Sequence, residues 1–299
     1  MLGLELGPSA VRAALVERGK VLRRHDQALP IGASPDVVID AIVRAAAALD
    51  PNPRAAGLAI PGELDGNGRC WGMLELPGFD GVYIAEELAA RLGCPVAIES
   101  QGQSAAWGER LYGRGRGHAS LLSVLVGSRL SAGLVLDGQL RRGRAGFGAG
   151  IAHLCVDTAP SARVCVCGRC GCLDAYASLR ALELDYASRS GNTAAAAEIV
   201  EAASSAGTPA LEAVSALASA LGAGLASIQN MLDLDAISVS TPLPGLFALL
   251  EPRLREILRA SVFGLPAAEI PVLESVLGAD AALVGATELA LRGINDASS

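Results

Sequence analysis

The chain has 299 residues, of which 51% are hydrophobic and 18% charged, and its formal net charge is −7. A chain this apolar and weakly charged is not intrinsically disordered, and its length suits two domains rather than one. Aromatic residues make up 3%, and Lys20 is the single lysine among 24 basic residues, so the composition lacks the stacking platforms and basic arm of a nucleic-acid-binding protein.

The sequence carries no signal for a membrane or for export. The sequence has no uninterrupted run of about 18 apolar residues, so no membrane-spanning helix is predicted. Its first residues lack the basic region and cleavage site of a secretion signal. We therefore expect a cytoplasmic protein with no membrane association. Four of the seven cysteines lie within residues 165–172, and such clustering in the cytoplasm indicates a metal site rather than a disulfide framework. We expect the three scattered cysteines, Cys70, Cys94 and Cys155, to be buried as small hydrophobes.

The first half of the chain alternates strands and helices. Apolar segments bounded by turn residues predict strands over 2–6, 11–17, 20–28, 55–62 and 94–99. Helical spacing predicts helices over 34–49, 83–92 and 102–111, the first of them opened by Ser34 and Pro35. Alternating glycines and arginines at 112–118 predict a hinge.

The opening pattern then returns. Residues 121–143 repeat the layout of residues 2–24: an apolar strand, a glycine (Gly7 or Gly127), a second strand, a glycine turn and a third strand. Such a repeat is expected of two related lobes. Two similar hairpins also arise by chance, so spacing alone leaves a duplication open.

The remaining segments continue the alternation. The pattern predicts strands over 151–156, 237–240 and 272–276, and helices over 178–189, 193–206, 209–233 and 279–293. We expect an α/β architecture, with an N-terminal lobe of residues 1–117 and a C-terminal lobe of residues 118–278. The terminal helix at 279–293 should pack back on the first lobe.

The strongest chemical motif is CVCGRCGCLD (165–174), with His153 upstream. Zinc binds four soft or borderline ligands tetrahedrally, and Gly168 and Gly171 permit the sharp turns that would aim several thiols at one ion. Cys170 is then surplus, or it competes with Cys172 or His153. The residues alone also fit an iron–sulfur cluster, a redox pair or buried thiols.

His153 followed by this cysteine pattern resembles the zinc signature of the ROK family (repressors, open reading frames and sugar kinases). The resemblance runs nearly end to end through GLAIPGELD (57–65), LPGFDG (76–81), CPVAIESQGQSAAWGE (94–109) and LGADAALVGATELA (277–290). It implies a two-lobed, actin-like (ribonuclease-H-like) α/β fold and self-association into at least a dimer. It also implies a structural zinc held by His153, Cys165, Cys167 and Cys172.

The phosphate-binding segments depart from the family pattern. ROK kinases hold ATP phosphates on glycine-rich turns, because glycine lets backbone amides approach the phosphate closely. The first turn, typically Asp-x-Gly-Gly-Thr, reads Glu5-Leu6-Gly7-Pro8-Ser9, and Pro8 removes an amide donor. The second begins Gly127-Ser128-Arg129, and a third glycine run reads Ser240-Thr241-Pro242. We therefore expect no ATP binding.

The sugar-binding positions also differ. The family's catalytic Asp matches Gln101, and an amide cannot accept the sugar's proton, so no catalytic residue is predicted. Glu99, two residues earlier, is expected to be a structural carboxylate rather than a replacement base. The residues expected to line a remodelled ligand cleft are Glu75, Ser100, Gln101, Gly150 and Asp174.

These departures predict a non-catalytic ROK protein: a pseudokinase acting as a sensor, regulator or assembly partner, with a possible small-molecule ligand. One alternative is an ATP-dependent sugar or amino-sugar kinase. Another is the effector core of a ROK repressor truncated of its DNA-binding domain. Family repressors carry a winged helix-turn-helix before the first hairpin, which begins here at Leu2, so we expect no direct DNA binding.

Overall fold

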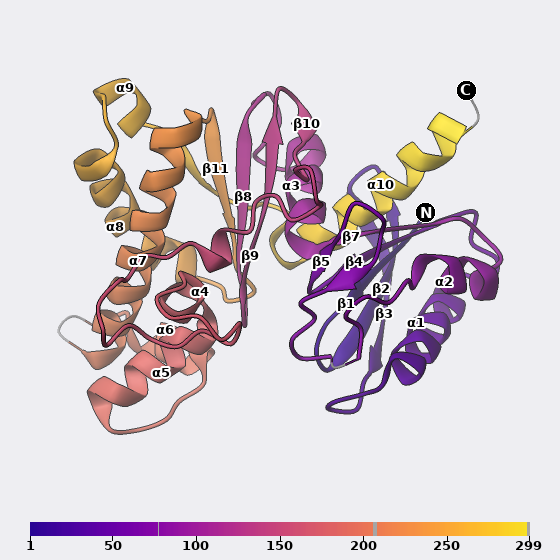
Figure 1. Ribbon diagram of the computed structural model, residues 1–299, viewed down its shortest axis with the longest axis horizontal. Helices are drawn as coiled ribbons and strands as arrows, with labels where there is room; N and C mark the ends of the chain where they lie inside the picture. The colour runs from indigo at the N-terminus through magenta and orange to yellow at the C-terminus, as the bar shows by residue number, and fades with distance from the viewer. Residues whose placement is uncertain (77, 206–207, 298–299) are drawn as a thin grey trace. The chain divides into compact units, whose positions relative to one another are not determined.

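The computed structural model describes residues 1–76, 78–205 and 208–297 (Figure 1). Pro77, from the Leu-Pro-Gly segment noted above, and Ala206, the expected end of one helix, lie outside the described residues. Contacts divide the chain into two units. The first unit comprises Met1–Ala119, Gly133–Ala149 and Ala279–Ser299, and the second comprises Ser120–Ala132 and Gly150–Gly278. Residues 133–149, expected in the C-terminal lobe, thus group with the first unit.

The first unit is built on a five-stranded sheet. Its strand order is β3 (Lys20–Ala28), β2 (Ala10–Glu17), β1 (Leu2–Leu6), β4 (Ala56–Ile60) and β7 (Val96–Ser100). The first three strands form an antiparallel meander, and β4 and β7 run parallel to β1. The helices of this unit are α1 (Pro35–Leu49), α2 (Ala85–Leu92), α3 (Gln101–Tyr112) and α10 (Ala281–Ala297).

Helices cover both faces of this sheet because successive residues of a strand point to opposite sides. Leu2, Leu4 and Leu6 belong to the apolar core shared with α1. The alternate position Gly3, and Gly57 on β4, face α10: a Cβ at Gly57 would lie 1.9 Å from the Ala286 carbonyl oxygen. The terminal helix therefore packs backbone to backbone against β4, and it also packs along α3 (Figure 1).

A short hairpin in the first unit was not anticipated from the sequence. It consists of β5 (Glu63–Leu64) and β6 (Cys70–Trp71), paired antiparallel. The turn between them is closed by the Asp65 carboxylate, which accepts hydrogen bonds from the Asn67 and Arg69 backbone amides and from Trp71 Nε1. Two-residue strands are too short for a periodic signal, which explains why sequence patterning missed them.

The second five-stranded sheet has the order β10 (Gln139–Leu140), β9 (Leu130–Leu136), β8 (Leu121–Val126), β11 (Ala236–Ser240) and β12 (Val272–Glu274). This is the order of the first sheet, strand for strand, with β11 parallel to β8 and to β12. The shared topology supports the internal repeat that spacing alone left open.

The second unit contains most of the helices. They are α4 (Asp174–Ala177), α5 (Leu179–Ser190), α6 (Ala196–Ala202), α7 (Pro209–Leu232), α8 (Leu246–Ser261) and α9 (Leu265–Ala268). Among the described residues, α7 is the one helix long and apolar enough to cross a membrane. This is weak support for a span, because 56% of its most apolar window is buried within the protein, as expected of a core helix.

The strand expected at 151–156 is wrong. Ile151–His153 forms a 3-10 turn (η1), and a second 3-10 turn, η2, spans Gly278–Asp280. After η1, Cys155 makes only an isolated bridge with Cys172. The physical reason is local: the Leu173 amide donates to the Leu154 carbonyl oxygen and the Val156 amide to that of Gly171, so this backbone pairs with the cysteine loop instead of extending a sheet.

Candidate functional site

Gln101, at the position of the family's catalytic Asp, starts α3 directly after β7. Ser100 caps the helix, and its Oγ accepts a hydrogen bond of 3.3 Å from the Gln103 amide. This cap fixes the start of α3, so that Gln101 is the first residue of the helix. Its Nε2 donates to Glu5 Oε1 at 3.1 Å and to the Leu6 carbonyl oxygen at 3.1 Å. The amide of Gln101 thus bridges α3 to β1.

Glu5 is a buried carboxylate in the middle of the sheet, with 8% of the residue exposed. Its Oε2 pairs with the Arg12 guanidinium on β2, which also donates to the Ala279 carbonyl oxygen and lies 3.9 Å from Asp280. Burial raises the pKa of the Glu5 carboxyl, while Arg12 acts in the opposite direction and does not fully offset it. A carboxyl of raised pKa is a stronger base than an ordinary glutamate.

Glu99 is buried, and it has two partners of its own. Its Oε1 accepts a hydrogen bond of 2.9 Å from the Ser100 amide, and its Oε2 pairs with Arg142. The Glu99 charge also acts on Glu63. Burial, followed by this charge, raises the pKa of Glu63 to about 8, while a hydrogen bond with Ser100 opposes the change. Sequence patterning offers no signal for this carboxyl pair, because the pair depends on the unforeseen β5 hairpin.

The loop at 141–148 is tied to α3 by Gln103. Gln103 Nε2 donates to the carbonyl oxygens of Arg141 and Gly148 at 3.2 and 3.1 Å, and its Oε1 accepts from the Leu134 amide at 3.4 Å. Gln103 is 1% exposed. The first turn of α3 therefore holds the loop that supplies Arg142 to Glu99.

The turn at Gly7-Pro8-Ser9 is a closed hairpin between β1 and β2. The Gly7 amide donates to the Ala10 carbonyl oxygen at 2.9 Å. Pro8 occupies the tip, where this turn-closing bond does not require its missing amide. The proline that the sequence marks as an obstacle is accommodated by the turn.

The second turn, Gly127-Ser128-Arg129, opens the second unit in the same way, with the Gly127 amide donating to the Arg129 carbonyl oxygen at 3.1 Å. The Arg129 side chain does not extend from the turn. Its Nη1 lies 3.0 Å from Asp174 Oδ2, and Asp174 Oδ1 accepts a hydrogen bond of 2.8 Å from the Leu130 amide. Asp174 is 3% exposed, so the charges of turn and carboxylate neutralise each other.

The two other expected cleft residues are exposed. Glu75 is an exposed loop residue of the first unit, and Gly150 is an exposed residue that precedes η1 in the second. The third altered phosphate-binding segment is Ser240-Thr241-Pro242. Its Ser240 Oγ donates to the Gly278 carbonyl oxygen at 3.3 Å, and its Thr241 Oγ1 accepts from the Leu243 amide at 3.2 Å. Within the units, the structure brings together Ser100 with Gln101, and Arg129 with Asp174.

The ligand atoms of His153, Cys165, Cys167 and Cys172 all lie within 4.8 Å of one another. Cys165 Sγ is 3.9 Å from His153 Nδ1, and Cys167 Sγ is 3.7 Å from Cys172 Sγ. Thiolates bound tetrahedrally to zinc at about 2.3 Å lie about 3.8 Å apart. The donor set and spacing therefore fit a four-coordinate zinc ion, and the four residues are those that the family resemblance implies.

Tight backbone turns produce this convergence. The Gly168 amide donates to the Cys165 carbonyl oxygen and the Cys165 amide to that of Arg169, with Gly168 and Gly171 at φ of 84° and 78°. Both angles lie in the left-handed region that favours glycine. Cys170 is exposed and outside the group of four. Cys155 is also exposed, so its expected burial is wrong, whereas Cys70 and Cys94 are buried.

The thiols have unequal acidities before any metal is considered. Burial raises the pKa of Cys165 and raises that of Cys172 to about 12, with hydrogen bonding to Cys167 adding to the latter change. For Cys167, burial is outweighed by a hydrogen bond from the Arg169 backbone and by its thiol neighbours, which lower its pKa. Burial lowers the pKa of His153. A neutral imidazole is the form that binds a metal.

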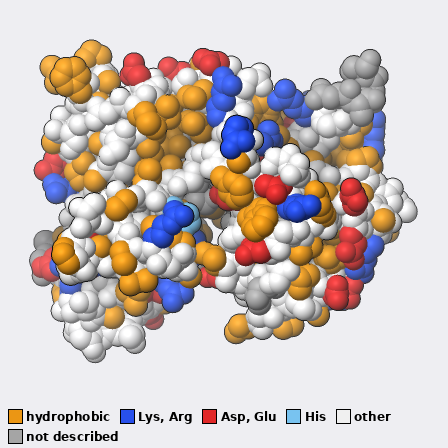
Figure 2. Space-filling view, viewed as in Figure 1, with side chains coloured by type: hydrophobic (Ala, Val, Ile, Leu, Met, Phe, Trp, Pro, Cys, Tyr) orange, Lys and Arg blue, Asp and Glu red, His pale blue; other side chains and the backbone are white. Residues whose placement is uncertain are grey.

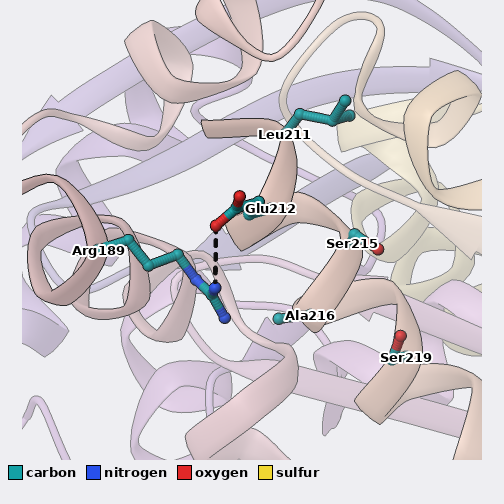
Figure 3. A pocket seen from close by; sticks show the side chains of 6 residues that line it. All are labelled: Arg189, Leu211, Glu212, Ser215, Ala216 and Ser219. Atoms are coloured by element: carbon teal, nitrogen blue, oxygen red, sulfur yellow. Dashed lines mark hydrogen bonds and ion pairs between the residues drawn. The ribbon is translucent and has the colours of Figure 1, made fainter. Parts of the chain in front are cut away.

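An open depression of about 460 Å³ on the second unit involves none of these residues (Figure 3). It lies between α5 and α7 and is lined by Arg189, Leu211, Glu212, Ser215, Ala216 and Ser219. Arg189 reaches across it to Glu212 at 3.3 Å and is also paired with the buried Asp185. On the face shown in Figure 2, basic side chains are interspersed with acidic and hydrophobic ones.

Two sheets of one strand order, each opened by a strand–glycine turn–strand unit, define the class of the two-lobed actin-like ATPase fold. The sequence model of the ROK family matches residues 1–293, and the chain belongs to this family. The glucokinase of Streptomyces coelicolor is 30% identical over 313 residues, covering 97% of this chain and 96% of that protein.

The solved structures agree. A ROK family glucokinase from Streptomyces griseus, crystallised in complex with glucose and AMPPNP, has a TM-score of 0.88 at 27% identity and covers 98% of this chain and 99% of its own. Among the relatives found by sequence, the xylose repressor of Bacillus spizizenii is 22% identical over 99% of this chain and 78% of that protein.

These comparisons contradict the expected pseudokinase. Relatives at 30% identity over nearly the whole chain are glucokinases, and a similar structure contains glucose and an ATP analogue. The expectation that ATP does not bind conflicts with the same findings. The error lay in treating each altered position separately: Pro8 fits its turn, and the charge of Arg129 is neutralised by Asp174.

Proposed function

We propose that this protein is an ATP-dependent sugar kinase of the glucokinase type. The observation that carries the proposal is the similarity to glucokinases over 97% of the chain, joined to a TM-score of 0.88 with a glucokinase that contains glucose and AMPPNP. The reaction is the transfer of the γ-phosphoryl group of ATP to a sugar hydroxyl, with ADP as the leaving group.

The geometry of the two glycine turns supports ATP as the phosphoryl donor. Both turns are closed hairpin tips, at Gly7 and at Gly127. Phosphoryl transfer depends mainly on holding the phosphates in place and neutralising their charge. A turn stiffened by its own hydrogen bond presents its remaining groups in a fixed direction, and Pro8 adds to that stiffness.

On the sugar side, we propose that Ser100 and Gln101 contact the substrate from the start of α3, and that Glu75 of the same unit takes part in its recognition. Gln101 uses Nε2 for Glu5 and Leu6. Its Oε1 remains suited to accept a hydrogen bond from a sugar hydroxyl, since an amide oxygen has two lone pairs. Gln101 thereby serves in orientation rather than proton transfer.

We propose that His153, Cys165, Cys167 and Cys172 hold a structural zinc ion. Four protein ligands fill a tetrahedral site and leave no open position for catalysis. When bound, zinc supplies folding free energy to the loop that contains Gly171 and leads into α4 at Asp174. We further propose that the chain works in the cytoplasm as a homo-oligomer of two or more copies, which light scattering tests.

The deciding experiment is a coupled assay of ADP release with Mg-ATP and a panel of glucose, other hexoses and amino sugars, with the product sugar phosphate measured by mass spectrometry. We expect glucose-dependent turnover at about 1–100 s⁻¹, the usual range for kinases. A reaction without sugar controls for simple ATP hydrolysis. The absence of sugar-dependent ADP release across the panel, together with no Mg-ATP binding in calorimetry, would contradict the proposal.

A further inference from the structure

A kinase that carries an amide at the position of the catalytic Asp needs another proton acceptor. Gln101 cannot fill this role, because the amide oxygen is not basic at physiological pH. The acceptor should be a carboxylate that reaches the same place from a different element.

The structure contains such a carboxylate. Glu5 Oε1 lies 3.1 Å from Gln101 Nε2, so the two side chains meet where α3 begins. Glu5 stands where the family's first phosphate-binding turn typically has Asp. Gln101 stands where the family has its catalytic Asp. The side chain at position 5 is one methylene longer, and the side chain at position 101 has lost its charge. The two departures are reciprocal: one carboxylate reaches farther and the other is replaced by a hydrogen-bond donor that holds it.

We propose, on the basis of the kinase function above, that Glu5 is the catalytic residue that accepts the proton of the reacting sugar hydroxyl, and that Gln101 positions its Oε1. Oε1 accepts a hydrogen bond from a neutral amide, whereas Oε2 is paired with the Arg12 guanidinium. Because a cation withdraws basicity from the oxygen it contacts, Oε1 is the more basic of the two.

Three other buried or half-buried carboxylates are less suited. Glu99 is held by Arg142 and by the Ser100 amide. Asp174 is held by Arg129 and by the Leu130 amide. Glu63 belongs to the hairpin that follows β4, and its hydrogen bond is with Ser100 rather than with Gln101. Glu5 differs from these three in being hydrogen-bonded to the residue at the catalytic position.

In the proposed step, the sugar O–H bond breaks and its proton moves to Glu5 Oε1. The hydroxyl oxygen forms a bond to the γ-phosphorus of ATP, and the bond from that phosphorus to the bridging oxygen breaks. The electron pair leaves with ADP, and the Glu5 carboxyl later returns its proton to water.

The charges that face Glu5 predict the pH dependence. Arg12 on β2 faces it directly, Asp280 ahead of α10 lies behind Arg12, and Arg24 on β3 pairs with Asp280. Gln101 on α3 is uncharged, and β4 has no charged residue. Burial raises the pKa of Glu5 above that of a free glutamate. Activity should therefore fall as the pH is lowered, with a midpoint above pH 4.5, which is the usual pKa of a glutamate.

The test compares four variants with the wild-type protein: Glu5→Gln, Glu5→Asp, Gln101→Asp and the double variant Glu5→Asp/Gln101→Asp. We expect Glu5→Gln to lower kcat by about 10²–10⁴-fold, the usual contribution of a general base, and to bind Mg-ATP within about threefold of wild type by calorimetry. Glu5→Asp should also lose activity because it withdraws the carboxylate. The double variant restores a carboxylate at position 101 and should recover at least tenfold in kcat over Glu5→Asp.

Glu17→Gln is the matched control, since Glu17 is exposed at the end of the neighbouring strand and should leave kcat unchanged. Glu5→Gln with kcat within threefold of wild type would overturn the assignment. So would loss of Mg-ATP binding in parallel with kcat, which would place Glu5 on the nucleotide. If Glu5→Gln does not fold, the double variant decides: no recovery over Glu5→Asp rejects the assignment. A wild-type protein without sugar kinase activity rejects the proposed function itself, a different result from an active enzyme that tolerates Glu5→Gln.

Discussion

Arg129 and Asp174 form an ion pair, with Arg129 Nη1 3.0 Å from Asp174 Oδ2. The arginine belongs to a turn that the ROK family pattern makes rich in glycine, and the aspartate is one of the residues expected to line the ligand cleft. Asp174 is buried and also accepts a hydrogen bond from the Leu130 amide. The charge added at position 129 is therefore neutralised within the second unit by Asp174, which lies shortly after the last cysteine.

This pair should contribute to the stability of the second unit. In Arg129→Ala, Asp174 keeps its hydrogen bond from Leu130 but loses its cation while remaining buried. We expect a loss of about 1–3 kcal/mol in the free energy of unfolding, the usual cost of leaving a buried polar group with fewer partners. Denaturant unfolding at neutral pH measures this loss.

The matched control is Arg141→Ala. Arg141 also pairs with an aspartate at 3.0 Å, but the side chain of its partner Asp137 is 84% exposed. Exposed pairs contribute between about 0 and 1 kcal/mol. Equal losses from the two variants would show that the buried position of Asp174 gives the first pair no special weight.

Glu63 should make the stability depend on pH. Burial, and then the Glu99 charge, raise its pKa from 4.5 to about 8. Between these values the folded state binds the proton more tightly than the unfolded state. The stabilisation is therefore fully present below pH 4.5 and is lost as the pH rises through 8. Because a pKa difference of one between the two states corresponds to about 1.4 kcal/mol, the effect should reach a few kcal/mol.

Glu63→Gln removes this ionisation while retaining a polar side chain of the same length. We expect the variant to lose less stability than wild type between about pH 6 and 9, and to be the more stable of the two at the alkaline end of that range. Glu75→Gln, a change at an exposed glutamate of the same unit, should follow the wild-type curve. Parallel curves for wild type and Glu63→Gln would show that Glu63 titrates as an ordinary carboxyl.

Much of the backbone followed from the sequence. The hairpins beginning at Leu2 and Leu121 have apolar strands and glycine turns, and their repeated layout corresponds to an identical strand order in the two sheets. Ser34 and Pro35 also begin α1 as predicted, with Ser34 at the N-cap and Pro35 in the first turn. These features are local, so a short window of sequence contains them.

The side-chain network was not predictable in the same way. Gln101 and Glu5 are 96 residues apart, and Arg129 and Asp174 are 45 apart. Each residue read alone suggested a damaged kinase motif. Only the folded positions show that two departures from the pattern lie in contact. The signal that the sequence did contain was that positions 5 and 101 both carry a side chain one methylene longer than the Asp of the family pattern, and that only position 5 keeps a carboxylate.

The cysteine loop should bind one metal ion per chain. We expect elemental analysis of the purified protein to find about one zinc, and Cys165→Ser to lose it, because Cys165 is one of four converging ligands. Structural zinc contributes several kcal/mol to folding, so Tm should fall by roughly 10 °C at this chain length. Cys170→Ser is the control: Cys170 is exposed and outside the ligand group. Loss of zinc from Cys170→Ser but not from Cys165→Ser would reverse the assignment.

The packing of α10 gives a prediction about the first unit. A Cβ at Gly285 would lie 1.7 Å from the Ser104 carbonyl oxygen on α3, a contact between two backbones that no side-chain rotation relieves. Gly293, two turns later on the same helix, has no heavy atom within 4 Å of its Cβ position.

The two glycines therefore separate packing from helix propensity. In Gly293→Ala the propensity gain of roughly 0.5–1 kcal/mol acts alone and should stabilise the protein. In Gly285→Ala it is outweighed by overpacking, which costs about 1–3 kcal/mol or more, so unfolding should occur at lower denaturant concentration than in wild type. If Gly285→Ala were as stable as Gly293→Ala, α10 would not lie against α3 at backbone contact.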